Sequence, residues 1–301
     1  MRLSEEHMED QKSKLKVSLI IPTNNFLERL PKELEKLNFE VLVNDCTEDC
    51  DFLIGMSISV IGQFGRFHYL YPNVSAILYN WDWYSHLDKT GRGMAGDWGE
   101  FIRMMEECKE VWSASKITAE KCQKDTGIVS PFWNYAFIIP EEWTEINHDS
   151  QYIIQASRQD PQKRFDWFEK AAKENGIVSK SYHPNTNSRP DFIQAVSNCS
   201  FLCVCSIDES LGGLTAAEAA FCRKPVLVAD FEGAKEVWGD DVWYFNKDSY
   251  DDLKVKMKWL WDNRNSQEVA DKKERAYSRC REIFMPEGFA LRIHNRLLEI
   301  K

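Results

Sequence analysis

The sequence has no apolar run long enough to span a membrane, and its first fourteen residues are polar and charged. We therefore expect no transmembrane segment and no secretory signal, and we predict a cytoplasmic protein. An excess of basic residues is also missing, because 48 aspartates and glutamates outnumber 38 lysines and arginines, and the net charge is −10. This balance argues against a general attraction to nucleic acid or to anionic membranes.

A cysteine framework is missing as well. The nine cysteines are an odd number in a chain of 301 residues, which is typical of a reducing compartment rather than a disulfide scaffold. Cys46 and Cys50 form one CxxxC pair with no second pair to complete a zinc site. We interpret them as ordinary core or surface thiols. Internal repeats and low-complexity tracts are also absent.

What the sequence does contain is enough apolar material for two domains, since 43% of its residues are hydrophobic. In the first half, apolar segments at 16–22, 39–44, 51–61 and 74–80 alternate with segments of helical character. This alternation predicts an α/β fold with a doubly wound parallel sheet. In such sheets ligands bind at the carboxyl ends of the strands.

Aromatic and ionisable residues follow the fourth of these segments. Trp81, Asp82, Trp83 and His86 come directly after it, and the glycine-rich segment 89–99 adds Arg92. We predict an acceptor pocket with a mobile lid here, with Asp82 or His86 orienting the acceptor. The alternative is a packed aromatic corner beside a loop.

The chain is expected to divide at a polar segment in its middle. We assign residues 1–140 to an N-terminal Rossmann-like domain, 141–150 to a linker and 151–285 to a C-terminal domain. Residues 286–301 form a last helix, expected to pack back on the N-terminal domain. Residues 179–190 are polar and are predicted to form a loop, in which His183 is a minor candidate for ligand contact.

The stretch 205–237 predicts an anion site. A buried strand leads into a loop that holds Glu209, Ser210, Gly212 and Gly213, and a helix follows. Unpaired N–H groups and the dipole at a helix start attract a phosphate, and glycine lets the backbone approach it. Glu218 lies one turn into the helix, where its carboxylate would accept hydrogen bonds from sugar hydroxyls. The arrangement suits a nucleotide diphosphate that carries a polyol.

With these residues in view, the second half resembles the retaining nucleotide-sugar glycosyltransferases of the GT-B fold, family 4 in particular, over residues 150–262. In that family a strand is followed by an arginine and, five residues on, a lysine, which hold the donor diphosphate. Arg158 and Lys163 stand at these positions. A guanidinium and an ammonium group together suit a pyrophosphate.

A second resemblance is to the family's Glu-x7-Glu loop and helix. Gly213 and Leu214 fall on its Gly-Leu pair, and Glu218 falls on the second glutamate, which binds the nucleotide ribose. Ser210 occupies the position of the first glutamate, and Glu209 or Asp208, immediately before it, replaces that glutamate if the loop carries one extra residue. Thr215 completes the predicted donor-binding residues. Further on, the segment 224–237 follows the family's pattern of proline, strand, glycine and Glu-Val.

The resemblance implies two Rossmann-like domains that face a cleft. It also implies a metal-independent transfer of a sugar, with retention, from a nucleotide-diphosphate donor to an acceptor hydroxyl. The acceptor would be a glycan or a small molecule. No metal and no cofactor other than the donor is expected.

Two other interpretations remain open. The missing first glutamate favours a non-catalytic nucleotide-sugar-binding subunit, whereas Arg158, Lys163 and Glu218 favour an enzyme. A transferase that acts on a hydroxylated base in DNA, as some phage enzymes of this fold do, would use Trp81, Trp83 and Arg92 to hold the base. The acidic net charge argues against it.

Overall fold

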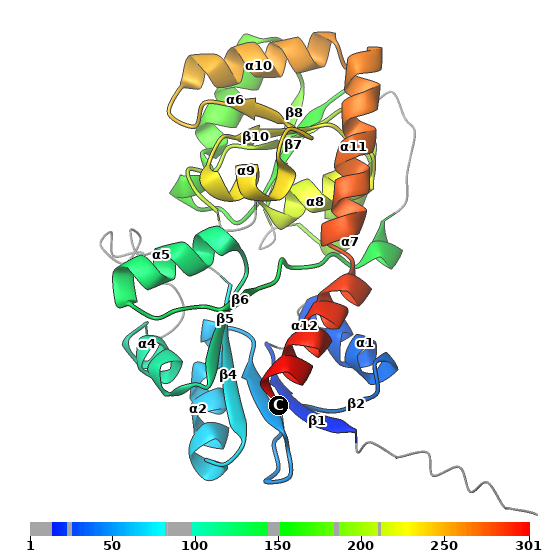
Figure 1. Ribbon diagram of the computed structural model, residues 1–301. Coiled ribbons are helices and arrows are strands. Elements are labelled where there is room, and N and C mark those ends of the chain that lie inside the picture. The colour runs from blue at the N-terminus through cyan, green and yellow to red at the C-terminus, as the bar shows by residue number, and fades with distance from the viewer. Residues whose placement is uncertain are drawn as a thin grey trace, which may run out of the picture.

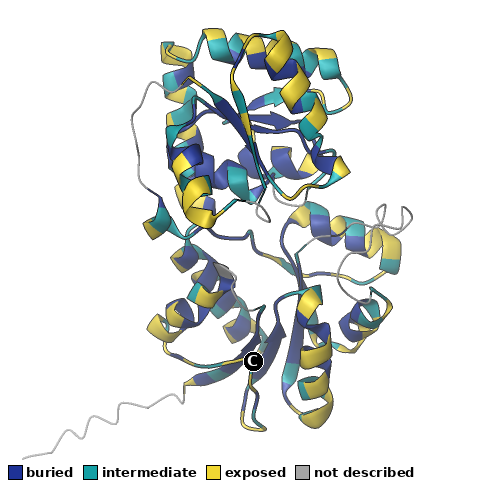
Figure 2. Ribbon diagram, turned by 180° about the vertical axis from the view of Figure 1, so that it is seen from behind, coloured by how far each residue is buried: buried dark blue, intermediate teal, exposed yellow. Residues whose placement is uncertain are grey.

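The computed structural model describes residues 14–22, 26–81, 83, 98–143, 151–183, 187–209 and 212–301. Two parallel sheets, each covered by helices on both faces, form an N-terminal and a C-terminal domain (Figure 1). The central strands are buried, whereas the helices expose their outer faces (Figure 2). None of the described helices has the length and apolar character needed to cross a bilayer.

The N-terminal sheet has the strand order β2-β1-β3-β4-β5-β6, and all of its pairings are parallel. Its strands are β1 (Leu15–Ile20), β2 (Phe39–Val43), β3 (Phe52–Gly55), β4 (Ser75–Asn80), β5 (Glu110–Ser113) and β6 (Phe132–Trp133). Its helices are η1 (Phe26–Arg29), α1 (Leu30–Lys36), η2 (Ile58–Val60), α2 (Ile61–Leu70), α4 (Trp98–Glu107) and α5 (Lys116–Thr126).

The third apolar segment, 51–61, holds a strand only in its first part. The strand ends at Gly55, and the helix α2 begins at Ile61. Two glycines inside α2 lower its intrinsic helix propensity, but Ile61 and Phe64 are buried against the sheet. Packing of these side chains against the sheet therefore outweighs the low helix propensity of the two glycines.

The C-terminal sheet has the order β11-β10-β9-β7-β8, again with parallel pairings. Its strands are β7 (Ile153–Ala156), β8 (Ser179–Tyr182), β9 (Leu202–Val204), β10 (Val226–Ala229) and β11 (Trp243–Phe245). Its short helices are η3 (Pro140–Glu142), which precedes the domain, and η4 (Pro161–Lys163); the longer ones are α6 (Phe165–Glu174), α7 (Arg189–Asn198), α8 (Leu214–Phe221), α9 (Glu232–Trp238), α10 (Tyr250–Asp262) and α11 (Gln267–Ile283).

The loop predicted over 179–190 is wrong in its first part, because Ser179–Tyr182 is the strand β8. This strand pairs with β7 alone and lies at the edge of the sheet. An edge strand is covered on fewer sides than a central one, so it does not need the apolar run that marks the buried strands.

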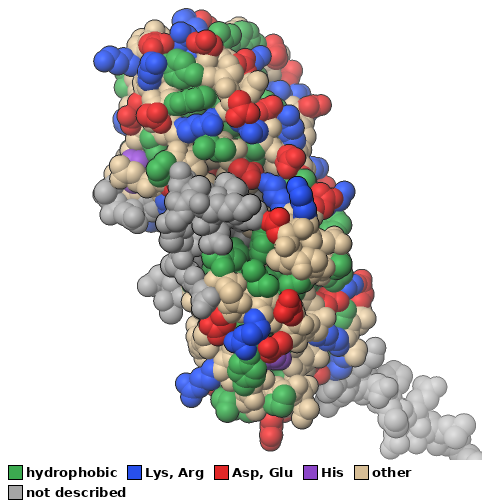
Figure 3. Space-filling view, turned by 90° about the vertical axis from the view of Figure 1, so that its left-hand side faces the viewer, with side chains coloured by type: hydrophobic (Ala, Val, Ile, Leu, Met, Phe, Trp, Pro, Cys, Tyr) green, Lys and Arg blue, Asp and Glu red, His purple; other side chains and the backbone are tan. Residues whose placement is uncertain are grey.

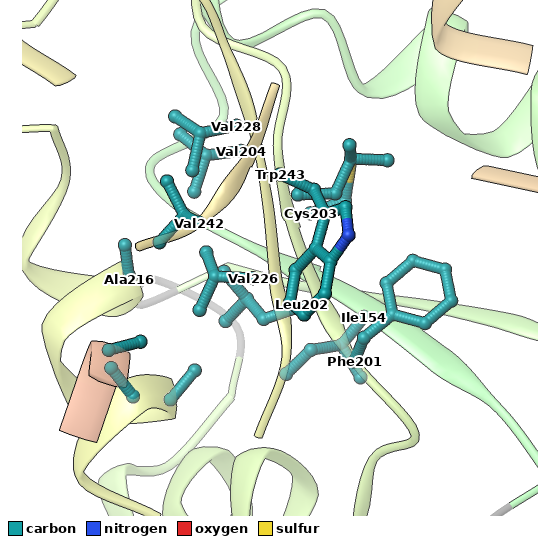
Figure 4. Packing of buried hydrophobic residues seen from close by; sticks show 14 of the residues in the cluster. Ile154, Phe201, Leu202, Cys203, Val204, Ala216, Val226, Val228, Val242 and Trp243 are labelled. Carbon is teal, nitrogen blue, oxygen red and sulfur yellow. The ribbon is translucent and has the colours of Figure 1, made fainter. Parts of the chain in front are cut away.

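The packing of α8 fixes where its first residue lies. Val204, Val226 and Val228 point to the side of the sheet on which Ala216 of α8 lies, and Cys203 and Trp243 point to the other side (Figure 4). The four alanines of α8 are fully buried, so the helix approaches the sheet closely. Its N-terminus is thereby held at the carboxyl end of β9.

The chain crosses between the domains twice. The first crossing follows β6, the second follows α11, and the two lie side by side. The N–H of Ile138 donates to the carbonyl of Phe284 at 3.0 Å. The final helix, α12 (Pro286–Ile300), then runs along α1 of the N-terminal domain, with Phe289 and Ile293 in its core (Figure 1). Asn134 ties this helix to the first crossing, because its side-chain amide donates to the carbonyl of Phe289 at 3.1 Å.

Candidate functional site

Gly212 and Gly213 lead the chain into α8 in a conformation that suits glycine. Their φ angles are +69° and +85°, in the region that residues with a Cβ rarely adopt. A Cβ on Gly212 would also lie 2.8 Å from Nε1 of Trp238 and 3.1 Å from Cα of Ala234. The first backbone N–H groups of α8 have no partner within the helix, so this turn presents donors to an anion.

A partly buried ion pair lies beside this helix start. Lys163, at the end of η4, is only 5% exposed, and its Nζ is 2.5 Å from Oε1 of Glu209. The hydroxyl of Ser206 donates to the same oxygen. The other carboxylate oxygen, Oε2, lies 3.4 Å from the position that a Cβ on Gly213 would take. The predicted donor-binding residues Lys163, Glu209 and Gly213 therefore meet at one point.

Arg158 is not part of this group. It follows β7 on the surface and is exposed, and within the described residues its guanidinium makes no ion pair. It is also not among the described residues that line the neighbouring cavity. Of the two cations predicted to bind the diphosphate, Lys163 therefore lies at the start of α8, whereas Arg158 does not belong to this group of residues.

A cavity of about 650 Å³ opens at the start of α8. Leu214, Thr215 and Glu218 of α8 line it, and the size is within the range of small-molecule sites. Its remaining lining comes from both domains, from the first crossing between them and from the ends of β7 and β8: Glu28, Phe137, Ile138, Ile139, Glu142, Ala156, Ser157, Tyr182, His183, Asn187, Ser188, Arg189 and Phe192.

Glu218 is the buried charge of this cavity. Burial raises the pKa of its carboxyl to about 7, and the neighbouring Arg189 guanidinium opposes that rise. Nη2 of Arg189 is 2.7 Å from Oε1 of Glu218 and 2.6 Å from Oε2 of Glu142. The guanidinium also lies over the rings of Trp143 and Phe192, at 5.1 and 5.2 Å from their centroids. One cation is thus shared by two carboxylates at the wall of the cavity.

The sequence did not predict Arg189 or Glu142 as site residues. The signal for Arg189 was present in the start of its helix, which lies at the end of the segment predicted as a loop. Ser188 caps α7 by accepting from the N–H of Asp191, and a proline stands in the first turn. This pattern places Arg189 at the first position of the helix. Glu142 had no comparable local signal, because it meets Arg189 only through the fold.

The acceptor-side tryptophans are packed within the N-terminal domain. Trp83 is 5% exposed, and its indole N–H donates to Oδ2 of Asp125 at 2.7 Å. Trp81 donates to the carbonyl of Met56 and stacks on Phe289 with an interplanar angle of 7°. Both rings are therefore used in packing. The candidates Asp82, His86, Arg92 and Ser210 lie outside the described residues.

Among the described parts of the chain, no group of three or more His, Cys, Asp or Glu residues is arranged to hold a metal ion. Cys46 and Cys50 are buried free thiols, and burial together with the neighbouring Cys50 raises the pKa of Cys46 to about 11.

Comparison with known proteins gives a family match and a fold. Residues 145–277 match the model of the family described as glycosyl transferases group 1. Among solved structures, HepE from Anabaena in complex with UDP and glucose is 12% identical, with a TM-score of 0.71, over 95% of this chain and 100% of that one. Comparison with the curated proteins finds no match.

Two further structures show the same architecture. Sucrose-phosphate synthase from Thermosynechococcus elongatus is 9% identical, with a TM-score of 0.67, and the match covers 95% of this chain and 99% of that one. TarM of S. aureus is 14% identical, with a TM-score of 0.65, over 83% of this chain. The match spans only 55% of the TarM chain. The resemblance to GT-B glycosyltransferases and the predicted GT-B fold, two Rossmann-like domains facing each other, are thereby confirmed.

Proposed function

We propose that this protein is a glycosyltransferase that moves a sugar from a nucleotide-diphosphate donor to an acceptor hydroxyl, with retention of the anomeric configuration. The observation that carries the proposal is the meeting of Lys163, Glu209 and the glycine turn at the start of α8, next to a cavity that contains Glu218. The family match and the UDP complexes of HepE support it.

The start of α8 is the proposed diphosphate site. Breakage of the bond between the anomeric carbon and the phosphate oxygen leaves the electron pair, and the developing negative charge, on the nucleoside diphosphate. The ammonium group of Lys163 and the free amides of α8 would stabilise that charge. The acceptor oxygen forms the new bond to the anomeric carbon on the same face of the sugar, and its proton leaves with the diphosphate.

Glu209 has two roles in this proposal. Without donor its carboxylate is the anion that pairs with Lys163, at 2.5 Å. When the diphosphate takes that place, the carboxylate is released beside the sugar, where it would accept hydrogen bonds from sugar hydroxyls. Glu209 would thereby take over from the serine that stands at the position of the family's first glutamate.

The cavity is the proposed nucleoside site. Glu218 would accept hydrogen bonds from the ribose hydroxyls, and Arg189 favours the ionised form of this carboxylate against the effect of burial. Among the described residues that line it, Glu28, Glu142 and Glu218 supply three carboxylates, and Arg189 supplies one guanidinium. This excess of negative charge favours a neutral polyol over a phosphate, so the phosphates would extend toward Lys163 and not into the cavity.

The acceptor would approach from the N-terminal domain. Acidic and basic side chains are interspersed over the described part of the face shown in Figure 3. No continuous basic surface is visible on that part, and no other observation on the described residues favours a nucleic-acid acceptor. We therefore propose a glycan or small-molecule hydroxyl as the acceptor.

The first test is a thermal-shift screen over nucleotide sugars, followed by an assay of nucleoside diphosphate release without acceptor. We expect Lys163→Ala to abolish release while the protein stays folded, because the negative charge on the leaving group would lose its cationic partner. Lys173→Ala, which removes an exposed lysine of α6, is the matched control and should behave like the wild type. Near-normal release by Lys163→Ala would contradict the diphosphate site. Binding without any release would identify a non-catalytic nucleotide-sugar-binding protein.

A further inference from the structure

The helix α5 belongs to the N-terminal domain but begins against the C-terminal domain. The two oxygens of Glu236, in α9, accept from the backbone N–H groups of Lys116 and Ile117, each at 2.8 Å. The hydroxyl of Tyr135, on the first crossing, donates to the same carboxylate at 2.8 Å. Figure 1 shows α5 below α9 and to its left. A carboxylate at a helix N-terminus is a favourable contact, so the start of α5 is held in place relative to the C-terminal domain.

A second contact joins α5 to the loop of the donor site. Nζ of Lys121 is 2.6 Å from Oδ2 of Asp208, and both side chains are partly buried, at 31% and 21% exposure. Glu232 of α9 lies farther from the same lysine, at 3.9 Å. Asp208 directly precedes Glu209, the residue that faces Lys163. Lys121, from the N-terminal domain, thus holds the loop of the C-terminal domain that positions the Glu209 carboxylate.

The 206–209 loop has few other restraints. The N–H of Ile207 donates to the carbonyl of Gln162 at 2.9 Å, and Ser206 and Lys163 contact Glu209 itself. Of these restraints, the Lys163 contact would be lost when a diphosphate pairs with that lysine. The Lys121–Asp208 ion pair does not involve the diphosphate site and would persist through that exchange.

We propose that Lys121 is a positioning residue for the donor site, which it serves by fixing the 206–209 loop through Asp208. This inference rests on the proposed function. Lys121 does not line the cavity and does not contact Lys163, so it acts through Asp208 and not on the donor. Because it belongs to the N-terminal domain, Glu209 is placed correctly only when α5 is docked on the C-terminal domain. The acceptor-side domain thereby takes part in building the donor site.

The size of the effect follows from the sensitivity of transfer to geometry. A displacement of about 1 Å in a group that orients the reacting atoms lowers a rate by up to about 10²-fold. The loop retains its Gln162 contact when Lys121 is removed, so we expect a smaller loss, of about tenfold in kcat. The donor diphosphate still meets Lys163 and α8, and its dissociation constant should change by less than about threefold.

The experiment measures kcat and KM for nucleoside diphosphate release, together with the dissociation constant of the same nucleotide sugar by calorimetry. The variants are Lys121→Ala, Asp208→Ala and the double variant, with Lys121→Arg as the conservative replacement. Lys124→Ala removes an exposed lysine of the same helix and is the matched control. Thermal unfolding of each variant shows that it is folded.

The expected result is a reduced kcat in Lys121→Ala with a nearly unchanged dissociation constant, partial recovery in Lys121→Arg, and wild-type values in Lys124→Ala. The double variant should be no slower than either single variant, because both act through one contact. A kcat within about twofold of wild type in Lys121→Ala, or losses that multiply in the double variant, would overturn the inference alone. A wild-type protein that releases no nucleoside diphosphate would overturn the proposed function and this inference with it.

Discussion

Replacing Glu218 by glutamine tests the cavity through its effect on stability. The pKa of the Glu218 carboxyl rises on folding from 4.5 to about 7, chiefly because the group is buried. Between pH 5 and pH 8 the unfolded chain has already lost this proton, whereas the folded chain loses it near pH 7. Stability contributed by the protonated group is therefore present at low pH and is lost as pH rises.

The two pKa values set the size of the effect. Integrated from pH 5 to pH 8, they correspond to a loss of about 2.5 kcal/mol in the free energy of unfolding of the wild type. Glutamine keeps an oxygen for Arg189 and does not titrate, so Glu218→Gln should not show this loss. Relative to the wild type, the free energy of unfolding of Glu218→Gln should therefore increase by about 2.5 kcal/mol between pH 5 and pH 8.

The assay is urea unfolding of both proteins at pH 5 and pH 8, because the difference between them cancels the other titrations. Glu106→Gln, at an exposed position of α4, is the control and should follow the wild type. At pH 8 Glu218→Gln should also bind the nucleotide sugar about tenfold to a hundredfold more weakly, since a charged acceptor of ribose hydrogen bonds is lost. The assignment of a buried, titrating carboxyl would be refuted if the difference in unfolding free energy between Glu218→Gln and the wild type changed by less than about 0.5 kcal/mol between pH 5 and pH 8.

Two further changes test the glycine turn and the interdomain contact. Gly212→Ala should destabilise the protein by about 2 to 4 kcal/mol, because it adds a collision with Trp238 to the strain of a positive φ. Gly127→Ala is the control for backbone strain alone, because Gly127 has φ +80° and open space around it, and it should cost about 1 kcal/mol. Equal losses of stability for Gly212→Ala and Gly127→Ala in urea unfolding would contradict the collision with Trp238. Glu236→Ala should cost about 1 to 2 kcal/mol, because it removes the acceptor of the Lys116 and Ile117 N–H groups while the Ser115 cap remains; the exposed Glu232→Ala should cost almost nothing. Similar unfolding midpoints for the two glutamate variants would count against the cap.

The fold could be predicted from the sequence because its central strands carry a strong signal. Buried parallel strands are short apolar runs between helices, and segments such as β1, β4, β9 and β10 have this form. The edge strand β8 and the helix α2 were missed for opposite reasons. The first is polar because it lies at the edge, and the second contains glycines that only its burial overrides.

The site was predictable where its residues are close in the chain. Gly212, Gly213 and Glu218 lie within seven residues of one another, and helix geometry alone relates them. The partner of Lys163 was also among the predicted residues, since Glu209 was considered as a replacement for the first glutamate.

Contacts made by distant segments could not be found in this way. Arg189 and Glu142 are 47 residues apart and meet only because the first crossing passes beside α7. Lys121 and Asp208 are 87 residues apart, and their ion pair depends on how the two domains dock. The exposure of Arg158 could likewise not be predicted, because its spacing from Lys163 fits the pattern of the family that the sequence resembles.

The most direct test of the account is a crystal structure of the protein with the nucleotide sugar that gives the largest thermal shift. The account predicts that the diphosphate lies within hydrogen-bond distance of Nζ of Lys163 and of the first amides of α8, with the ribose hydroxyls on Glu218. Glu209 should then have turned from Lys163 toward the sugar. A diphosphate bound elsewhere, with the Lys163–Glu209 ion pair still intact, would contradict it.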